Sequence, residues 1–169
     1  MKVTIVQERP EMYREIEALV RRAFWDRYAP GCMEHYLLHV LRSHADFVPG
    51  LSLTAMLEGR PVGQCACVKG RLLGDDGTET VVLTLGPIAV HPDHQGKGIG
   101  GMLLAETAQI AKGLNYPAIF LTGDPAYYSR QGYLPAEQFG IRNGDNCYAA
   151  ALQVLPLKEN ALVPGRYEE

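Results

Sequence analysis

The chain of 169 residues has the length of one ordinary domain, so we expect residues 1–169 to form a single domain with one site. Hydrophobic residues make up 47% of the chain, and no apolar run approaches the roughly 20 residues that cross a bilayer, which argues against a membrane protein. A net charge of −3, without a lysine or arginine cluster, argues against a general nucleic-acid surface. The first ten residues lack the pattern of a secretory signal, so we expect a cytoplasmic location.

The N-terminal half shows both strand and helix patterns. Residues 2–7 alternate as a strand, and residues 11–24 place their apolar side chains on one helical face. We expect a second helix over roughly residues 33–44. Residues 51–73 then predict two strands joined at residues 58–61, which favours a hairpin.

The C-terminal half begins with a long apolar strand over residues 80–90. Proline lacks the N–H that a paired strand needs, so we expect strand pairing to stop at Gly86-Pro87. A helix over about residues 97–114, a strand over 118–123, a short segment over 124–133 and a strand over 147–157 follow. The order β-α-α-β-β-β-α-β-α-β(β), a hairpin followed by a βαβ crossover, predicts an α/β (α+β) fold with a mixed sheet.

A glycine-rich turn, QGKGIGG, lies between the long strand and the next helix. It contains Gly96, Gly98, Gly100 and Gly101, although glycine in a helix costs about 1 kcal/mol relative to alanine. Such a turn gathers backbone N–H groups at the positive end of the helix dipole, where phosphate binds well, and Lys97 adds a cation. The alternative is a tight turn with close helix-to-sheet packing and no ligand.

Two nucleotide-binding motifs fit the turn poorly. A Rossmann fingerprint follows the first strand, whereas this turn follows the fourth, although Asp124 falls near the expected acidic position. A Walker A loop needs G-x-x-x-x-G-K-[ST], and no such run exists. Binding of ATP or NAD by the turn therefore has little support.

Two motifs indicate a family. Residues 95–100, QGKGIG, resemble the Q/R-x-x-G-x-G/A motif of the GNAT superfamily of acyl-CoA-dependent N-acetyltransferases. Residues 126–133, AYYSRQGY, are similar to the later aromatic and glycine signature of that family. A looser likeness to an uncharacterised bacterial branch rests on residues 124–133 and the closing apolar strand. The resemblance implies one acetyltransferase domain with a GNAT-like, mostly antiparallel sheet flanked by helices.

The resemblance also implies a site that binds acetyl-CoA. The pyrophosphate would bind the amides of the turn, and the pantetheine arm would pair with backbone groups at the end of the fourth strand. The implied cofactor-binding residues are Ile88, Ala89, Val90, Gln95, Gly96, Lys97, Gly98, Ile99, Gly100 and Gly101. No metal is implied, and the partners are acetyl-CoA and an amine acceptor. By analogy with that fold, a homodimer is a further expectation.

Tyr128 matches the tyrosine that acts as the general acid in the family. A phenol with a pKa of about 10 is protonated at neutral pH and can donate to the departing thiolate. Tyr127 is its rival, because adjacent helical residues point about 100° apart and only one can face the sulfur. The alternative, that both tyrosines are packing residues, stays open.

A general base is not evident in the sequence. The fourth strand has no carboxylate or histidine at its centre. Glu79, near its start, could act through water, and Thr84 could hold a water molecule, but a glutamate at a strand end is usually only solvated. An amine that arrives neutral, or bulk water as the proton acceptor, removes the need for a base. An alternative function is therefore a non-catalytic acyl-CoA-binding or sensing module.

The acceptor cannot be identified from the sequence. We expect its pocket between residues 25 and 47 and in the last strands, with Trp25, Tyr28, Tyr36 and His39 as candidates, although aromatic residues at these spacings are more often core. Acidic residues that could attract a cationic amine are Asp75, Asp76 and Glu79.

Metal and disulfide chemistry has weak support. His35 and His39 have zinc-ligand spacing but lack the glutamate and third ligand of a zincin, so we interpret the segment as an amphipathic helix. The cysteines are interpreted as buried, reduced thiols, and Cys65 and Cys67 are expected to face the same side of a strand: the full set is Cys32, Cys65, Cys67 and Cys147.

Overall fold

The structure is a computed structural model that describes residues 2–169. The chain divides into two compact units. Unit 1 contains residues 1–67 and 86–107, and unit 2 contains residues 68–85 and 108–169. The long strands β3 (Arg60–Gly74) and β4 (Glu79–Val90) contribute to both units. The expectation of a single domain stays a prediction.

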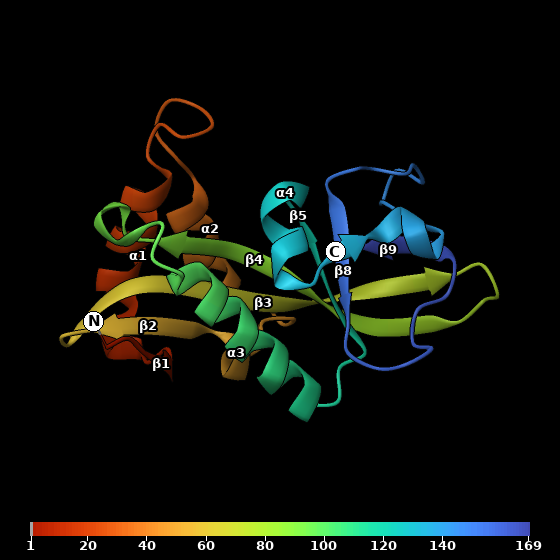
Figure 1. Ribbon diagram of the computed structural model, residues 1–169, viewed down its shortest axis with the longest axis horizontal. Helices are drawn as coiled ribbons and strands as arrows, with labels where there is room; N and C mark the ends of the chain where they lie inside the picture. The colour runs from red at the N-terminus through yellow and green to blue at the C-terminus, as the bar shows by residue number, and fades with distance from the viewer. Residues whose placement is uncertain (1) are drawn as a thin grey trace. The chain divides into compact units, whose positions relative to one another are not determined.

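Unit 1 has two helices before its main strands. Its elements are β1 (Thr4–Gln7), η1 (Pro10–Met12), α1 (Tyr13–Phe24), α2 (Glu34–Leu41), η2 (Pro49–Leu51) and β2 (Leu53–Leu57), followed by the first part of β3, the last part of β4, η3 (Pro92–His94) and the start of α3 (Ile99–Gly113) (Figure 1). Strand β2 pairs antiparallel with both β1 and β3. The predicted first helix, hairpin and β4 are therefore present, and α2 is shorter than the predicted residues 33–44.

The alternation along β3 places helices on opposite faces of unit 1. A Cβ at Gly63 would lie 3.0 Å from Leu103 and 3.1 Å from Ile99 of α3. Ala66 instead belongs to a buried cluster formed mainly by side chains of α1 and α2, including Ile16 and Leu38. Because neighbouring strand residues point to opposite faces, α3 covers one face and α1 and α2 cover the other.

Unit 2 contains the C-terminal strands together with parts of β3 and β4. Its strand order is β3-β4-β5-β8-β6, with β9 paired to both β3 and β7. The bounds of the added elements are β5 (Ala118–Thr122), α4 (Pro125–Tyr128), η4 (Ser129–Gln131), β6 (Leu134–Pro135), η5 (Ala136–Phe139), β7 (Ile141–Arg142), β8 (Leu152–Pro156) and β9 (Gly165–Glu168). The pairs β4–β5 and β7–β9 are parallel, whereas β5–β8, β6–β8 and β3–β9 are antiparallel. The predicted mixed, mostly antiparallel sheet flanked by helices is confirmed.

Three boundaries differ from the prediction. The strand predicted over residues 147–157 begins only at Leu152. The side chain of Asn143 accepts hydrogen bonds of 3.0 Å from the N–H groups of Asp145 and Cys147, which holds this segment in a turn. Helix α3 begins at residue 99, and β4 runs through Gly86-Pro87 as one strand, because proline removes one donor but keeps an extended backbone.

The cysteines are free but not equally buried. Cys65 and Cys67 are buried, as expected, and burial raises the pKa of the Cys65 thiol to about 11. Cys147 is exposed and Cys32 is only partly buried, so the interpretation of all four as buried thiols is wrong at these two positions. The turn that contains Cys147 leaves its thiol at the surface.

Candidate functional site

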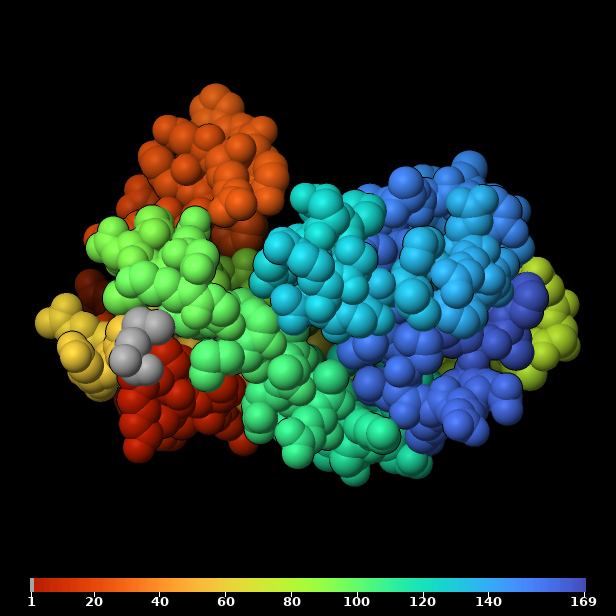
Figure 2. Space-filling view, viewed as in Figure 1, coloured from red at the N-terminus to blue at the C-terminus, as the bar shows by residue number. Residues whose placement is uncertain are grey.

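The glycine turn lies in unit 1 between β4 and α3. After β4 ends at Val90, the short helix η3 leads to an exposed segment, residues 95–98, shown in light green on the surface in Figure 2. Gly96 and Gly98 have φ of +75° and +83°, and a Cβ at either position would meet no heavy atom within 4 Å. These glycines therefore allow the positive φ of the turn and leave the space beside the backbone open. Close packing within the turn does not require them.

The start of α3 presents free backbone donors. The N–H of Met102 donates to the carbonyl of Gly98 at 3.0 Å, so the earlier amides of the first turn have no acceptor within the helix. These are the amides of Ile99, Gly100 and Gly101. The first turn of α3 contains no acidic residue, and Lys97 is exposed directly before it. The arrangement suits an anion such as phosphate.

The end of β4 is packed on one face and is tied to the glycine turn by a side chain. Ala89 is 3% exposed and packs with the α1–α2 cluster, whereas Ile88 and Val90 are half-buried. The side chain of Gln95 donates to the carbonyl of Val90 at 3.0 Å. Gln95 therefore ties the turn to the last residue of the strand.

The parallel pairing of β4 with β5 is short. It comprises Leu83 with Ile119 and Thr84 with Phe120, while β4 itself continues to Val90. Pairing with β5 therefore ends before Gly86-Pro87, whereas β4 itself remains a strand through these two residues.

Tyr128 lies at the end of α4 in unit 2. Asp124 caps this helix by accepting from the N–H of Ala126 at 3.0 Å, and Pro125 occupies its first turn. The rings of Tyr127 and Tyr128 are nearly perpendicular, with an interplanar angle of 84°. The planes of the two phenol rings therefore differ in orientation. Burial raises the pKa of Tyr127, and the positive charge of Arg130 partly offsets this rise.

The candidates for a general base, and the acidic residues expected to attract a cationic amine, already have partners. Glu79 is paired with Arg71 at 3.1 Å, and the hydroxyl of Thr84 shares a hydrogen bond with the hydroxyl of Tyr167. A hydrogen bond from Arg142 lowers the pKa of Asp75, and one from Thr78 lowers that of Asp76. These side chains act as local structural partners in the structure.

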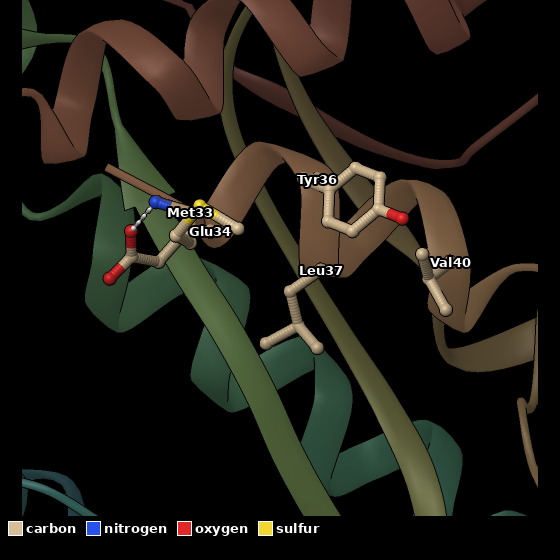
Figure 3. Close-up of a pocket in the computed structure, with 5 residues that line it drawn as sticks. All are labelled: Met33, Glu34, Tyr36, Leu37 and Val40. Carbon is tan, nitrogen blue, oxygen red and sulfur yellow. Dashed lines mark hydrogen bonds between the residues drawn. The ribbon is translucent and has the colours of Figure 1, made fainter. Parts of the chain in front are cut away.

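The aromatic candidates for the acceptor pocket are exposed rather than core. Trp25, Tyr28 and Tyr36 are 50%, 76% and 57% exposed. The N-cap residue of α2 and residues of the helix itself line a groove of about 330 Å³ (Figure 3). The lining residues are Met33, Glu34, Tyr36, Leu37 and Val40.

The two histidines with zinc-ligand spacing, His35 and His39, contact other groups. Nδ1 of His39 lies 3.0 Å from Glu17, and Nδ1 of His35 lies 3.5 Å from the sulfur of Cys32. Among residues 2–169, no group of three or more metal-ligating side chains comes together. No helix in the same part of the chain is long and apolar enough to cross a membrane.

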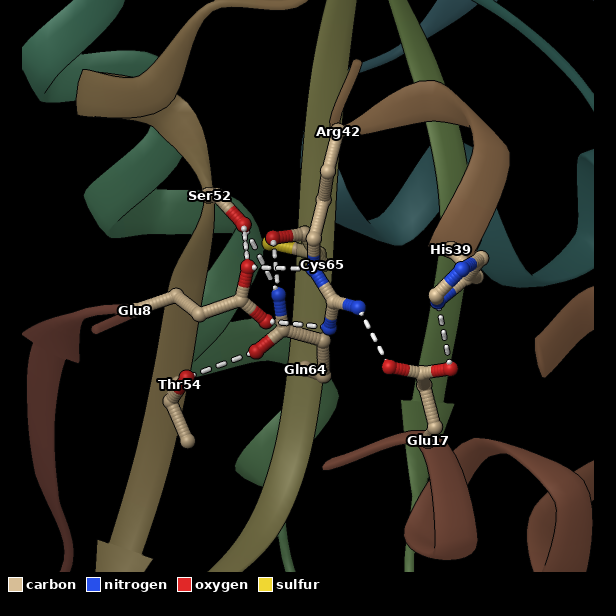
Figure 4. A network of polar contacts seen from close by, with 8 residues as sticks. All are labelled: Glu8, Glu17, His39, Arg42, Ser52, Thr54, Gln64 and Cys65. Carbon is tan, nitrogen blue, oxygen red and sulfur yellow. Dashed lines mark hydrogen bonds and ion pairs between the residues drawn. The ribbon is translucent and has the colours of Figure 1, made fainter. Parts of the chain in front are cut away.

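A buried ionic network in unit 1 was not anticipated from the sequence. Arg42, which caps α2, donates two hydrogen bonds to the carboxylate of Glu8 and one to Glu17, at 2.7 to 3.0 Å (Figure 4). Ser52 also donates to Glu8 and accepts from Gln64. Arg42 and Glu17 are 25 positions apart, and Ser52 and Glu8 are 44 positions apart. No local sequence pattern therefore predicts these contacts.

Comparisons with known proteins identify the family of the chain. The profile of the Acetyltransferase (GNAT) family matches residues 12–133. The chain is 31% identical over 147 residues to the uncharacterized N-acetyltransferase YhbS of Escherichia coli (strain K12), covering 87% of this chain and 83% of the relative. It is also 31% identical over 102 residues to the uncharacterized N-acetyltransferase YjhQ of the same strain. This match covers 60% of this chain and 52% of that relative, so the chain spans about half the length of YjhQ.

Two solved structures are similar over nearly the whole chain. The crystal structure of YhbS from Escherichia coli in complex with CoA has a TM-score of 0.85 and 27% identity, covering 99% of this chain and 89% of that one. A GNAT family acetyltransferase from Brucella melitensis in complex with acetyl-CoA has a TM-score of 0.79 and 27% identity, covering 99% and 96%. On these grounds the chain belongs to the GNAT family of acetyltransferases.

Proposed function

We propose that this protein transfers an acetyl group from acetyl-CoA to the amine of a small-molecule or peptide acceptor. The observation that carries the proposal is the turn between β4 and α3, where Gly96 and Gly98 leave open space over the free amides of the helix start. Similar GNAT structures bound to CoA and acetyl-CoA support the choice of ligand. The pyrophosphate binds the amides of residues 96–101, with Lys97 as a nearby cation.

The pantetheine arm binds along the end of β4. Its amides resemble peptide groups, so they pair with backbone groups of Ile88 and Val90 as an additional strand would. The short pairing of β4 with β5 supports this assignment, because a strand that continues beyond its partner has backbone groups available. Ala89 anchors the strand on its other face.

Transfer proceeds by direct attack. The lone pair of a neutral amine forms the new C–N bond, and the tetrahedral intermediate collapses with cleavage of the C–S bond. The thiolate takes a proton from the phenol of Tyr128, and the amine loses its excess proton to bulk water. Tyr128 regains its proton from solvent, so the products are an amide and free CoA.

The first test is titration calorimetry with acetyl-CoA, CoA, ATP and NAD. Wild type is expected to bind the two CoA compounds and neither nucleotide control. Gly100→Glu is expected to abolish this binding, because its carboxylate occupies the phosphate position. Gly113→Glu is the matched control at the far end of the same helix, where a Cβ meets no atom within 4 Å. If the wild-type protein does not bind CoA, the glycines have only a structural role in the turn.

The second test separates an enzyme from a binding module. With wild type, release of free thiol is measured across a panel of amines. Tyr128→Phe is expected to lower the rate by about 10²-fold or more while acetyl-CoA affinity stays within twofold. Tight acetyl-CoA binding without thiol release from any amine would favour the non-catalytic sensing module, and lost binding in Tyr128→Phe would refute the role as acid.

A further inference from the structure

Arg22 lies beside the segment that leads into the glycine turn. It occupies the last turn of α1, and its Nη1 is 3.1 Å from Nε2 of His91, the residue that follows β4. Both residues belong to unit 1, although 69 positions separate them. Neither side chain has a role in the transfer chemistry described above.

The contact between the two side chains is chemically incomplete. Nδ1 of His91 caps η3 by accepting from the N–H of Asp93 at 3.1 Å. A neutral imidazole has one acceptor nitrogen, and a guanidinium is only a donor, so His91 cannot accept from both Asp93 and Arg22. If the cap forms, Nε2 carries a hydrogen and faces another N–H donor.

Among residues 2–169, the exposed guanidinium of Arg22 therefore has no protein acceptor that matches its charge. Within residues 2–169, no carboxylate lies within the 4.0 Å of an ion pair with Arg22. Its neighbour Arg21 is differently engaged, with its guanidinium 4.6 Å from the centre of the Trp25 ring. A planar guanidinium with free donors matches two oxygens of a phosphate.

We propose that Arg22 is a cofactor-binding residue that donates to a phosphate group of CoA at the turn, exchanging its contact with His91 for an anionic acceptor. The inference rests on the proposed binding of CoA by the turn. It adds a cation from α1 to the amides of α3 and to Lys97, so that two distant segments recognise the same ligand. CoA offers two sources of phosphate, the pyrophosphate and the 3′-phosphate.

The test compares Arg22→Gln with Arg21→Gln by titration calorimetry. For CoA, the dissociation constant of Arg22→Gln is expected to rise about tenfold or more, and that of Arg21→Gln to stay within twofold. For pantetheine, which has no phosphate, neither variant is expected to differ from wild type. A loss with CoA but not with 3′-dephospho-CoA assigns the contact to the 3′-phosphate, and a loss with both assigns it to the pyrophosphate.

Two further variants separate a ligand contact from a structural bridge. His91→Asn keeps an acceptor for the cap of η3 but removes the partner of Arg22. A ligand contact predicts that His91→Asn binds CoA as wild type does and that Arg22→Lys recovers part of the affinity. Equal losses in His91→Asn and Arg22→Gln, or an Arg22→Gln affinity within twofold of wild type, would overturn the inference. Whichever result the Arg22 variants give, the proposed function stands if the wild-type protein binds CoA and Gly100→Glu abolishes that binding.

Discussion

The ring of Tyr128 lies directly against the α-carbon of Gly123. A Cβ on Gly123 would be 2.6 Å from Cε2 of that ring, closer than such contacts occur, and 3.2 Å from Cδ2. Gly123 is itself fixed, because its N–H donates to Ala151 and its carbonyl accepts from the side chain of Gln153. The absence of a side chain at residue 123 therefore leaves the space that the ring of Tyr128 occupies.

Replacing Gly123 with alanine is expected to displace the proposed acid without removing it. Since a shift of about 1 Å can cost about 10²-fold in rate, we expect kcat to fall by about 10-fold to 100-fold, with an unchanged KM for acetyl-CoA. Steady-state kinetics with an accepted amine checks this result. Gly113→Ala, where a Cβ meets open space, is the control. A Gly123→Ala enzyme with wild-type kcat would show that the position of this ring is irrelevant to the reaction.

Gly63 controls how closely α3 approaches the sheet. In Gly63→Val, the side chain would collide with Ile99 and Leu103, whose atoms lie 3.1 and 3.0 Å from the Cβ position. We expect a loss of about 1 to 3 kcal/mol in the free energy of unfolding and weaker CoA binding, because Ile99 begins the helix that presents the amides. Chemical denaturation and calorimetry measure both. Gly50→Ala, which meets no atom within 4 Å, should change neither.

The Arg42 network is expected to be important for stability. Burial alone lowers the pKa of Arg42, but the hydrogen bonds and charges of Glu8 and Glu17 outweigh it and raise the pKa. In Arg42→Met, the carboxylate of Glu8, which is 2% exposed, loses its counter-charge. We expect a loss of about 3 to 5 kcal/mol in unfolding free energy by chemical denaturation. Arg9→Gln, which breaks an exposed pair, should change stability by less than about 1 kcal/mol, and equal effects would contradict the prediction.

The buried thiols predict a loss of stability in alkali. Burial raises the pKa of Cys65 from 9.0 to about 11 and that of Cys67 well above 9.0, whereas in the unfolded chain both ionise near their ordinary pKa. Stability is complete below pH 9 and falls as pH rises from 9 towards 11, by about 1.4 kcal/mol per unit for each thiol. Denaturation across this range should show a shallower slope in Cys65→Ala than in wild type. In native protein at pH 8, a thiol reagent should label Cys147 and leave Cys65 unmodified.

Hydrophobic periodicity was sufficient to predict most of the main elements. The apolar face of α1 and the alternation of β3 are local patterns, and the structure places their side chains as these patterns indicate. The glycine turn was also evident, because positive φ at Gly96 and Gly98 requires a specific residue type. The start of α3 differs by two residues, since Gly98 lies outside the helical region.

Features that depend on distant pairing could not be found in the same way. Strand β9 is held by antiparallel pairing with Arg71 to Gly74, almost a hundred positions away, and its four residues carry no strong strand pattern. The contact of Arg22 with His91 and that of Arg42 with Glu8 likewise follow from the packing of α1 and α2. In each case the residues are ordinary in their own segment, and only tertiary structure makes them partners.

The interleaving of the two units also has a consequence for protein synthesis. Unit 1 is incomplete until Thr107 has emerged from the ribosome. By then residues 68–85 of unit 2 have already emerged. That nascent β-hairpin must wait for residues 108–169 before its own core can close. Truncating the chain at a single position therefore cannot yield either unit alone. A polypeptide that ends before residue 107 contains two incomplete cores.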